Sequence, residues 1–290
     1  MLRKGCAWCA WLTLGAGGCA ALAQQVLWDN GPLVTPTCFE DVVTSEVQIP
    51  GGYAGQNINT LTKPPTEAAD DFEVPVGVRW LISRITIFAY QPGVDEPLKP
   101  GTFKLYYGEH MPMGEAFISV TTGGSEFTGI YRNFHGYCET DRPIYTAVAE
   151  LEEPLELPGG RYWLSATIPS IFLTGPFVPN VTIPGQFGKP GGNAHHFLGK
   201  EWEMINAHPS GQFIPQDFPF MLEGEIVPDR CLADINADGV VNESDLGILL
   251  TDFGCASRPP ALCLADLDAD GVVGQLDLGI LLANFSQSCR

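Results

Sequence analysis

Two copies of one acidic twelve-residue pattern lie near the end of this 290-residue chain, and no other feature constrains its fold as much. The copies run from Asp234 to Asp245 and from Asp266 to Asp277. Each has oxygen-bearing side chains at positions 1, 3, 5 and 12 and a glycine at position 6. Calcium takes about six to eight oxygen ligands, which a tight loop of this kind brings together. The repeat therefore predicts two calcium ions.

The ligand at each loop position follows from calcium chemistry. Side-chain oxygens at positions 1, 3 and 5, the carbonyl at position 7 and the carboxylate at position 12 surround the ion. Position 9 is Asn242 in the first loop, which reaches the ion directly or through water, but Gly274 in the second, where water replaces it. The alternative is an acidic turn without metal, in which the crowded carboxylates would repel one another. The predicted ligands are Asp234, Asn236, Asp238, Val240, Asn242 and Asp245, then Asp266, Asp268, Asp270, Val272 and Asp277.

A short amphipathic helix is expected after each loop. Apolar residues recur at the spacing that puts them on one helix face. Neither helix can bury such a stripe alone, so we expect the two helices to pack against each other. The two stripes are Leu246, Leu249, Leu250 and Phe253, and Leu278, Leu281, Leu282 and Phe285.

Two loop–helix units in tandem, without the entering helix of a full EF-hand, resemble a type I dockerin. The resemblance covers about residues 229 to 290. Cysteines before each loop and after each helix make it similar to the cysteine-bearing subtype found in bacterial surface proteins. The resemblance implies a cohesin-like domain as partner, or another surface anchor protein. Positions 10 and 11 hold Glu243-Ser244 and Gln275-Leu276 where many cellulosomal dockerins have Ser-Thr, which argues against ordinary cellulosomal cohesin specificity.

A further set of helix residues lies opposite the apolar stripes. In the second repeat this set is apolar, with no evident place in a core of two helices. It forms either the surface that binds a partner or a contact with the preceding domain. The set comprises Ser244, Ile248, Thr251, Leu276, Ile280 and Ala283.

The N-terminus has the pattern of an export signal. Arg3 and Lys4 precede a weakly polar run, and Ala21-Leu22-Ala23 supplies a small-x-small cleavage site. Cleavage after Ala23 would yield a secreted or bacterial cell-surface protein with no membrane span. A lipoprotein acylated at Cys19 is the alternative.

Six of the nine cysteines remain after removal of residues 1–23, and an even count in an exported protein predicts disulfides. Four of them flank the two repeats, and four cysteines allow three pairings. The repeat symmetry favours Cys231–Cys255 and Cys263–Cys289. Cys38 and Cys138 would then pair with each other.

Residues 24–227 are expected to form a jelly-roll-like β-sandwich. Alternating residues from Phe103 to Tyr107 and from Tyr162 to Ile168 have the period of strands, and the run from Trp80 to Tyr90 is apolar almost throughout, as in a strand buried between two layers. Gly/Pro-rich turns separate these runs. The fold class is therefore mainly β, a sandwich followed by a small helical module over residues 228–290 with repeats at 231–255 and 263–289. Four segments resemble a β-sandwich domain of exported bacterial proteins: residues 69–75, 85–90, 154–164 and 218–224.

The sandwich carries no recognisable catalytic motif. The chain has 34 acidic and 15 basic residues, a net charge of −19, which excludes the basic footprint of a nucleic-acid-binding protein. His195-His196 lacks a third spaced metal ligand, and adjacent strand residues point to opposite faces. Tyr106, Trp163 and Trp202 belong either to the core or to a carbohydrate-binding face. We rank a non-catalytic surface or matrix protein first, a carbohydrate-binding module second and a polysaccharide-active hydrolase third.

Overall fold

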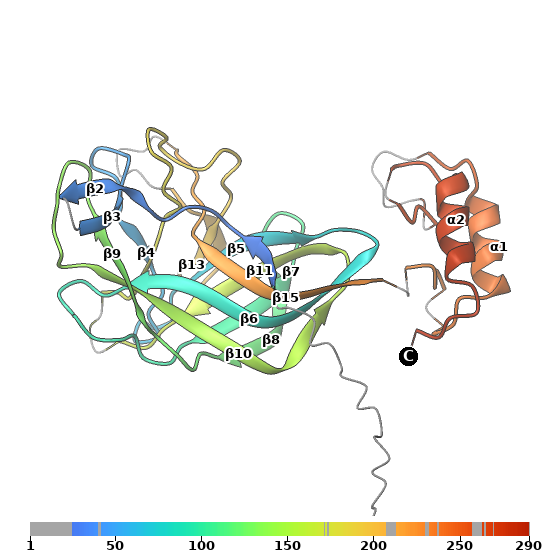
Figure 1. The fold of residues 1–290 in the computed structure, drawn as a ribbon, viewed down its shortest axis with the longest axis horizontal. Coiled ribbons are helices and arrows are strands. Elements are labelled where there is room, and N and C mark those ends of the chain that lie inside the picture. The colour runs from blue at the N-terminus through green and yellow to red at the C-terminus, as the bar shows by residue number, and fades with distance from the viewer. Residues whose placement is uncertain are drawn as a thin grey trace, which may run out of the picture.

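The computed structural model describes residues 25–39, 42–170, 172, 174–206, 213–229, 232–236, 238–256, 263, 265–268 and 270–289. The signal peptide expected over residues 1–23 lies outside these ranges. The described chain is mainly β, with two sheets in a sandwich-like arrangement and two short helices (Figure 1). None of the helices within the described ranges has the length and apolar character needed to cross a membrane.

The first sheet has nine strands. Its main path runs β1-β15-β6-β10-β9-β3-β2; off this path, β12 pairs with β6, and β4 pairs with β12. All pairs are antiparallel except β3 with β9, which run parallel. The strands are β1 (Gln25–Asp29), β15 (Phe220–Pro228), β6 (Val78–Tyr90), β10 (Pro143–Leu157), β9 (Phe127–Asn133), β3 (Val42–Glu46), β2 (Thr35–Phe39), β12 (Phe177–Pro179) and β4 (Gly55–Asn57).

The second sheet has six antiparallel strands, in the order β14-β13-β5-β11-β7-β8. They are β14 (Trp202–Met204), β13 (His195–Phe197), β5 (Glu67–Val74), β11 (Gly160–Thr167), β7 (Thr102–Tyr107) and β8 (Met113–Thr121). The strands predicted at 103–107 and 162–168 from alternation are confirmed as β7 and β11, because a two-residue period places every second side chain in the core. The strand predicted at 80–90 from its apolar run is confirmed as β6.

The main core lies between the two sheets. Phe72 of β5 stacks on Trp80 of β6 with ring centroids 6.1 Å apart, and it meets Phe220 of β15 edge-on at 6.2 Å. All three rings are at most 3% exposed. Large aromatic side chains from both sheets therefore join the two layers, and such rings contribute much of the buried apolar area of a domain.

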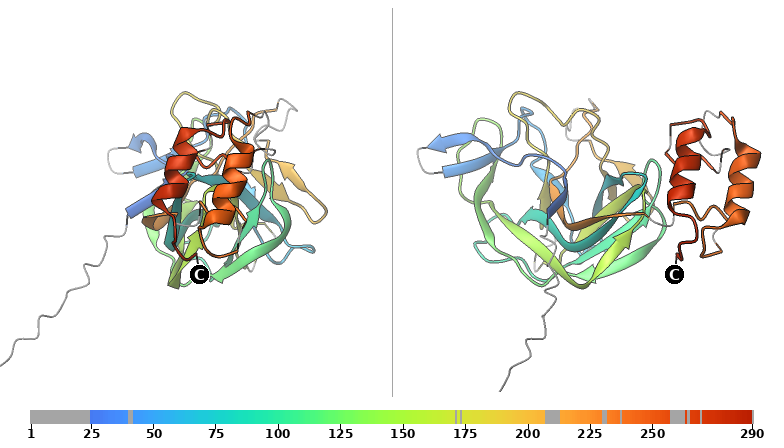
Figure 2. Two further views of the ribbon diagram at one scale, coloured as in Figure 1. Left: turned by 90° about the vertical axis from the view of Figure 1, so that its right-hand side faces the viewer. Right: turned by 45° about the vertical axis from the view of Figure 1, so that its right-hand side comes forward.

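The two helices are α1 (Glu243–Asp252) and α2 (Gln275–Ala283). They lie side by side at one end of the molecule, beyond the end of β15 (Figures 1 and 2). The connection after β15 is fixed to the sandwich at Asp229. Its amide donates to the Gly77 carbonyl at 3.0 Å, and its carboxylate accepts from Nε of Arg79 at 2.7 Å. We call residues 228–290 the tail and residues 24–227 the sandwich.

Candidate metal site

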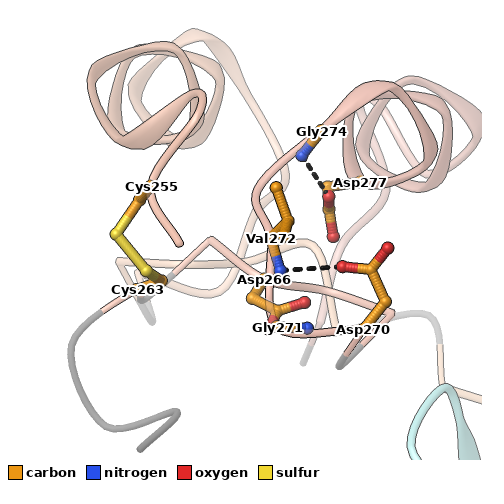
Figure 3. Close-up of a disulfide and its surroundings, with 8 residues drawn as sticks. All are labelled: Cys255, Cys263, Asp266, Asp270, Gly271, Val272, Gly274 and Asp277. Atoms are coloured by element: carbon orange, nitrogen blue, oxygen red, sulfur yellow. Dashed lines mark hydrogen bonds between the residues drawn. A yellow bond between two sulfur atoms is a disulfide. The ribbon is translucent and has the colours of Figure 1, made fainter. Parts of the chain in front are cut away.

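The second loop of the tail gathers three carboxylates. One ligand oxygen from each of Asp266, Asp268 and Asp270 lies within 4.8 Å of the other two. Oδ2 of Asp266 accepts from the Gly271 amide at 3.0 Å, whereas its Oδ1 is buried and has no hydrogen-bond partner (Figure 3). A buried carboxylate oxygen without a partner is unfavourable, so a cation bound at this oxygen would stabilise the loop.

Electrostatics within the second loop point the same way. The amide of Asp270 donates to Asp268 and lowers the pKa of that carboxyl. Partial burial and the neighbouring carboxylates of Asp277, Asp270 and Asp266 outweigh this bond and raise the pKa above its usual value. Mutual repulsion among these groups is the physical cause, and a bound cation would relieve it.

A sharp turn at the glycine shapes each loop. Gly271 has a φ of +89° and Gly239 a φ of +92°, in the left-handed region that favours glycine. The turn directs the following amide back into the loop, where the Val272 N–H donates to Oδ1 of Asp270 at 2.8 Å (Figure 3). Position 6 of each loop therefore needs glycine, as expected, because its backbone has a positive φ.

The aspartate at position 12 connects each loop to its helix. Asp277 is 1% exposed and accepts from the amides of Gly274 at 2.6 Å, Leu267 at 2.6 Å and Asp268 at 3.1 Å. Asp245 is 0% exposed and accepts from the amides of Asn236 and Asn242. Both residues thus act as helix caps through the bond to the residue three positions earlier. Sequence reasoning assigned them only as metal ligands.

The first loop satisfies its carboxylates differently. Nδ2 of Asn236 donates to Oδ2 of Asp238 at 3.0 Å, and Nδ2 of Asn242 approaches the same oxygen at 3.4 Å. Both oxygens of Asp234 accept main-chain amides, from Asp238 and Gly239. Amide N–H groups therefore stand in this loop where a cation would otherwise balance the charge. A metal ion needs the Asn236 amide turned so that its oxygen faces inward.

Main-chain hydrogen bonds connect the two repeats of the tail. After α1, the Gly254 amide donates to the Val273 carbonyl at 2.8 Å, and the Val273 amide donates to the Cys255 carbonyl at 2.9 Å. After α2, the Cys289 amide donates in the same way to the Gly239 carbonyl of the first loop at 2.9 Å. The end of each helix is thus bonded to the loop of the other repeat.

This crossed arrangement corrects the favoured disulfide pairing. Cys255 is bonded to Cys263, with Cα atoms 6.0 Å apart (Figure 3). The favoured pairs Cys231–Cys255 and Cys263–Cys289 are therefore wrong. The reason is that the end of α1 lies against the second loop, not against its own. Cys231 lies outside the described residues.

Of the remaining two cysteines, Cys138 is disulfide-bonded. The side chain of Cys38 lies outside the part of the chain that the structure describes. The pair Cys38–Cys138 stays a prediction.

The apolar stripes are buried only along one row. Leu249 and Leu281 are 0% exposed and meet at the centre of the tail core. Leu250 and Leu282, one residue further on, are exposed at 56% and 54%. The two helices do pack against each other, but they shield only the row between them, so the outer leucine of each stripe stays exposed. Phe253 is also exposed, whereas Leu246, Leu278 and Phe285 are partly buried.

The residues expected to bind a partner separate into two groups. Leu276 is 68% exposed, and Ser244, Thr251 and Ala283 are exposed as well. Ile280, by contrast, packs against the tail core, so the expectation that it has no place there is wrong. Ile248 is half-buried. The exposed large apolar side chains among the described residues of the tail are Val240, Leu250, Phe253, Val272, Leu276 and Leu282, and we call them the tail apolar set.

The aromatic residues proposed for a carbohydrate-binding face belong to the interior. Trp163 is 0% and Tyr106 7% exposed, and Nε1 of Trp163 donates to the Gly108 carbonyl at 2.9 Å. Trp202 packs edge-on against Tyr106. These three residues therefore form a second apolar cluster of the sandwich, which decides between the two alternatives in favour of the core.

The two adjacent histidines contact different neighbours. The ring of His195 packs edge-on against Trp163 at 5.2 Å, whereas Nε2 of His196 lies 3.8 Å from Glu203. Their side chains thus have different surroundings, as the alternation of side chains along a strand predicts. No protein-family model and no curated protein matches the chain.

Proposed function

We propose that the tail is a calcium-binding docking module through which an exported, non-catalytic protein attaches to a cohesin-like domain or another surface anchor protein. The observation that carries the proposal is the triad of Asp266, Asp268 and Asp270, in which one buried oxygen has no partner. Export to the bacterial surface or medium rests on the sequence pattern of residues 1–23.

Calcium suits this triad because all of its donors are hard oxygens. In the second loop, the Val272 carbonyl and water would complete the coordination of the ion. In the first loop, Asp234, Asn236, Asp238 and the Val240 carbonyl would bind it. Asp245 and Asp277 already hold main-chain amides, so their part is to fix the loop to the helix and to add negative charge. Since the ligands come together only in the folded loop, the free energy of binding adds to the stability of the tail.

The tail apolar set supports a protein partner. Leu276, Leu250 and Leu282 are each more than half exposed on a module whose own core is small. Apolar side chains that cluster on a small module are typical of an interaction surface. The polar neighbours Ser244 and Thr251 would add hydrogen bonds at its edge.

Calorimetric titration of the full chain with Ca²⁺ tests the metal. We expect two ions per chain for the wild type and one for the pair of substitutions Asp266→Asn and Asp270→Asn. Asp252→Asn, which removes one charge from the tail outside the loops, is the matched control and should retain both. No binding at millimolar Ca²⁺ would overturn the proposal.

A pull-down of bacterial surface proteins by the full chain tests the docking. We expect capture with Ca²⁺, loss of capture with chelator, and loss on Leu276→Asp. The Tyr53→Asp variant changes a side chain of the sandwich that is 49% exposed and should bind as the wild type does. Capture that is unchanged both by chelator and by Leu276→Asp would contradict a docking role for the tail.

A groove on the sandwich favours a second candidate function, the binding of a neutral polysaccharide. Its volume is about 510 Å³, and its lining mixes one exposed aromatic ring, Phe127, with Arg84, Glu126, Glu150 and threonine hydroxyls. Sugars present both C–H faces and hydroxyl groups, which such a lining can match. The strongly acidic chain disfavours polyanionic glycans.

The glycines of the groove provide a direct test. A Cβ added at Gly123 meets nothing within 4 Å, so a side chain there begins in open space, and Gly123→Val tests whether filling the groove blocks binding. We expect both Gly123→Val and Phe127→Ala to weaken binding on a panel of neutral polysaccharides by at least about tenfold, with Tyr53→Ala as control. Turnover of a polysaccharide would instead favour a hydrolase, and no binding at all would leave the docking function alone.

A further inference from the structure

The side chain of Lys189 reaches the side-chain amide of Asn30, although the two residues are 159 positions apart in the sequence. Nζ of Lys189 lies 2.9 Å from Oδ1 of Asn30 and 3.1 Å from the main-chain carbonyl oxygen of Asn30. Cγ of Asn30 is one bond of about 1.2 Å away from Oδ1, so the amine lies near a carbon that it can attack. Asn30 directly follows β1 and is 2% exposed, which keeps bulk water away from this carbon.

The hydrogen bonds of Asn30 fix the direction in which its amide points. Oδ1 accepts from Nε1 of Trp28 at 3.2 Å and from Nζ of Lys189, two groups that only donate. Nδ2 donates to the Phe218 carbonyl at 3.0 Å and to Oδ2 of Asp70 at 2.6 Å. If an amine attacks Cγ, the nitrogen that leaves therefore faces a carboxyl, and the oxygen that becomes negative faces the Trp28 N–H.

Asp70 is suited to act as a general acid. It is 0% exposed, and burial, together with the negative charge of nearby Asp217, raises the pKa of its carboxyl well above the usual value. Hydrogen bonds from the Phe218 and Asp71 amides lower this pKa but do not offset the burial. The protonated form is therefore favoured, and Oδ2 lies 2.6 Å from Nδ2 of Asn30, within the range for proton transfer.

Asp217 supplies a base for the lysine. Its Oδ2 lies 3.0 Å from Nζ of Lys189, and its Oδ1 accepts from the Asn193 amide at 2.7 Å. An ammonium group cannot attack a carbonyl carbon, because its nitrogen has no free electron pair, so Lys189 must first lose a proton. Asp217 can accept that proton, and the four side chains together provide a nucleophile, a base, an acid and an amide.

We propose that Lys189 and Asn30 become joined by an intramolecular isopeptide bond, which forms once in each folded chain. Nζ of Lys189 gives one proton to Asp217 and forms a bond to Cγ of Asn30. The bond between Cγ and Nδ2 then breaks as Asp70 protonates Nδ2, and Asp70 takes back a proton from Nζ. Ammonia leaves and takes up the proton held by Asp217, so both carboxyl groups return to their starting states. Because the reaction occurs once per molecule, a slow rate suffices.

The bond fixes the first strand of the sandwich. β1 lies at the edge of its sheet, paired with β15, the strand that leads into the tail. A covalent link between residues so far apart in the sequence lowers the entropy of the unfolded chain and thereby stabilises the folded one. Lys189→Arg, which keeps a positive charge beside Asp217, should lower the Tm of the sandwich on the order of 10 °C.

Mass spectrometry of the reduced and unfolded full chain tests the bond. Relative to its own sequence mass, the wild type should be lighter than Lys189→Arg by one molecule of ammonia. A proteolytic digest of the wild type should contain a branched peptide that joins residues 30 and 189. Lys104→Arg changes another paired lysine of similar exposure and should keep the mass deficit and the branched peptide. Asp70→Asn removes the acid and should lower the yield of the branched peptide at least about tenfold.

Other losses of ammonia do not depend on Lys189. Cyclisation of an N-terminal glutamine, or of Asn30 onto the amide of Gly31, would persist in Lys189→Arg, so the comparison of the two chains removes these contributions. An equal mass deficit in wild type and Lys189→Arg would overturn the proposal, as would a wild-type digest without the branched peptide. A yield in Asp70→Asn equal to that of the wild type would also overturn it.

Discussion

A buried carboxyl of the sandwich and one of the tail differ in how their oxygens are satisfied. Asp70 of the sandwich is 0% exposed, and Oδ2 accepts from Nδ2 of Asn30 at 2.6 Å and from the Phe218 amide at 2.9 Å. Oδ1 of Asp266 in the tail is buried with no partner. The sandwich therefore satisfies Asp70 with its own amide groups, whereas one oxygen of Asp266 in the tail is left for the proposed ion.

The hydrophobic cores of the sandwich and the tail also differ. The sandwich core contains large rings such as Phe72, Trp80 and Phe220, contributed by strands of both sheets. Among the described residues, the tail core has eight buried apolar side chains, including Leu249 and Leu281, and is joined by the bond between Cys255 and Cys263. Small cores rarely supply enough stability by themselves, so disulfides and metals supplement them. The five predictions below test how far this contrast extends.

Removal of calcium has the largest expected effect. In scanning calorimetry of the full chain, we expect two transitions, one for each region. Chelator should lower or abolish the tail transition, because the carboxylates of Asp266, Asp268 and Asp270 then repel one another, and should leave the sandwich transition in place. A sample with reduced disulfides controls for structure that Cys255–Cys263 retains. If chelator left the unfolding transition of the tail unchanged, the two regions would not differ in their dependence on an ion.

Truncation of the sandwich core comes next. Phe72→Ala should lower the free energy of unfolding of the sandwich by about 3–5 kcal/mol, since it removes a ring that packs against Trp80, Tyr162 and Phe220. Denaturant titration measures the change. Phe213→Ala, at a side chain that is 56% exposed, is the control and should stay within about 0.5 kcal/mol. The tail transition should not move in either variant.

Loss of the tail disulfide follows. Cys255→Ser with Cys263→Ser opens a loop with a sequence separation of 8, and we expect the tail to lose about 2–3 kcal/mol of stability. Thermal unfolding followed by far-ultraviolet circular dichroism checks this. The sandwich should unfold at its usual temperature. An unchanged tail would show that calcium and the helix core suffice.

The pH dependence of the two regions should differ. Burial lowers the pKa of His195, and burial also lowers the pKa of His196 beside Glu203, so the folded sandwich favours both neutral rings. The unfolded chain takes up these protons first, and the sandwich is therefore fully stable above pH 6.5 and loses stability as the pH falls below it. His195→Phe, which keeps a ring against Trp163, should flatten this dependence in unfolding curves measured at several pH values. An equal slope in the variant would assign the effect to other groups.

The smallest effect distinguishes the two repeats. The side chain of Asn242 accepts from the Ser244 amide and caps α1, while α2 begins at Gly274 without a side-chain cap. Gly274 has a φ of −139°, which other residues adopt freely. Gly274→Asn should stabilise the tail by a few tenths of a kcal/mol and strengthen calcium binding at the second loop. Gly279→Ala, inside α2, is a control that changes stability without adding a ligand.

Local patterns were predictable because they depend on neighbours in the sequence. Alternation located β7 and β11, an apolar run located β6, and the acidic spacing located the loop whose carboxylates do gather at Asp266, Asp268 and Asp270. The same patterns could not foresee that Leu250 and Leu282 stay exposed. Which side of a helix is covered depends on how its partner crosses it, and two short helices can cross in several ways.

The sequence by itself determined a β-rich domain followed by two acidic loop–helix units, because residue period and glycine turns act over a few residues. Only the tertiary structure decided that the end of each helix bonds to the loop of the other repeat, which pairs Cys255 with Cys263. Likewise, the residues near Arg132 in the sequence do not indicate that its side chain is buried and hydrogen-bonded to neutral groups. Its surroundings come from Ser45, Ala54 and Asn180, and contacts between such distant segments exist only once both sheets have formed.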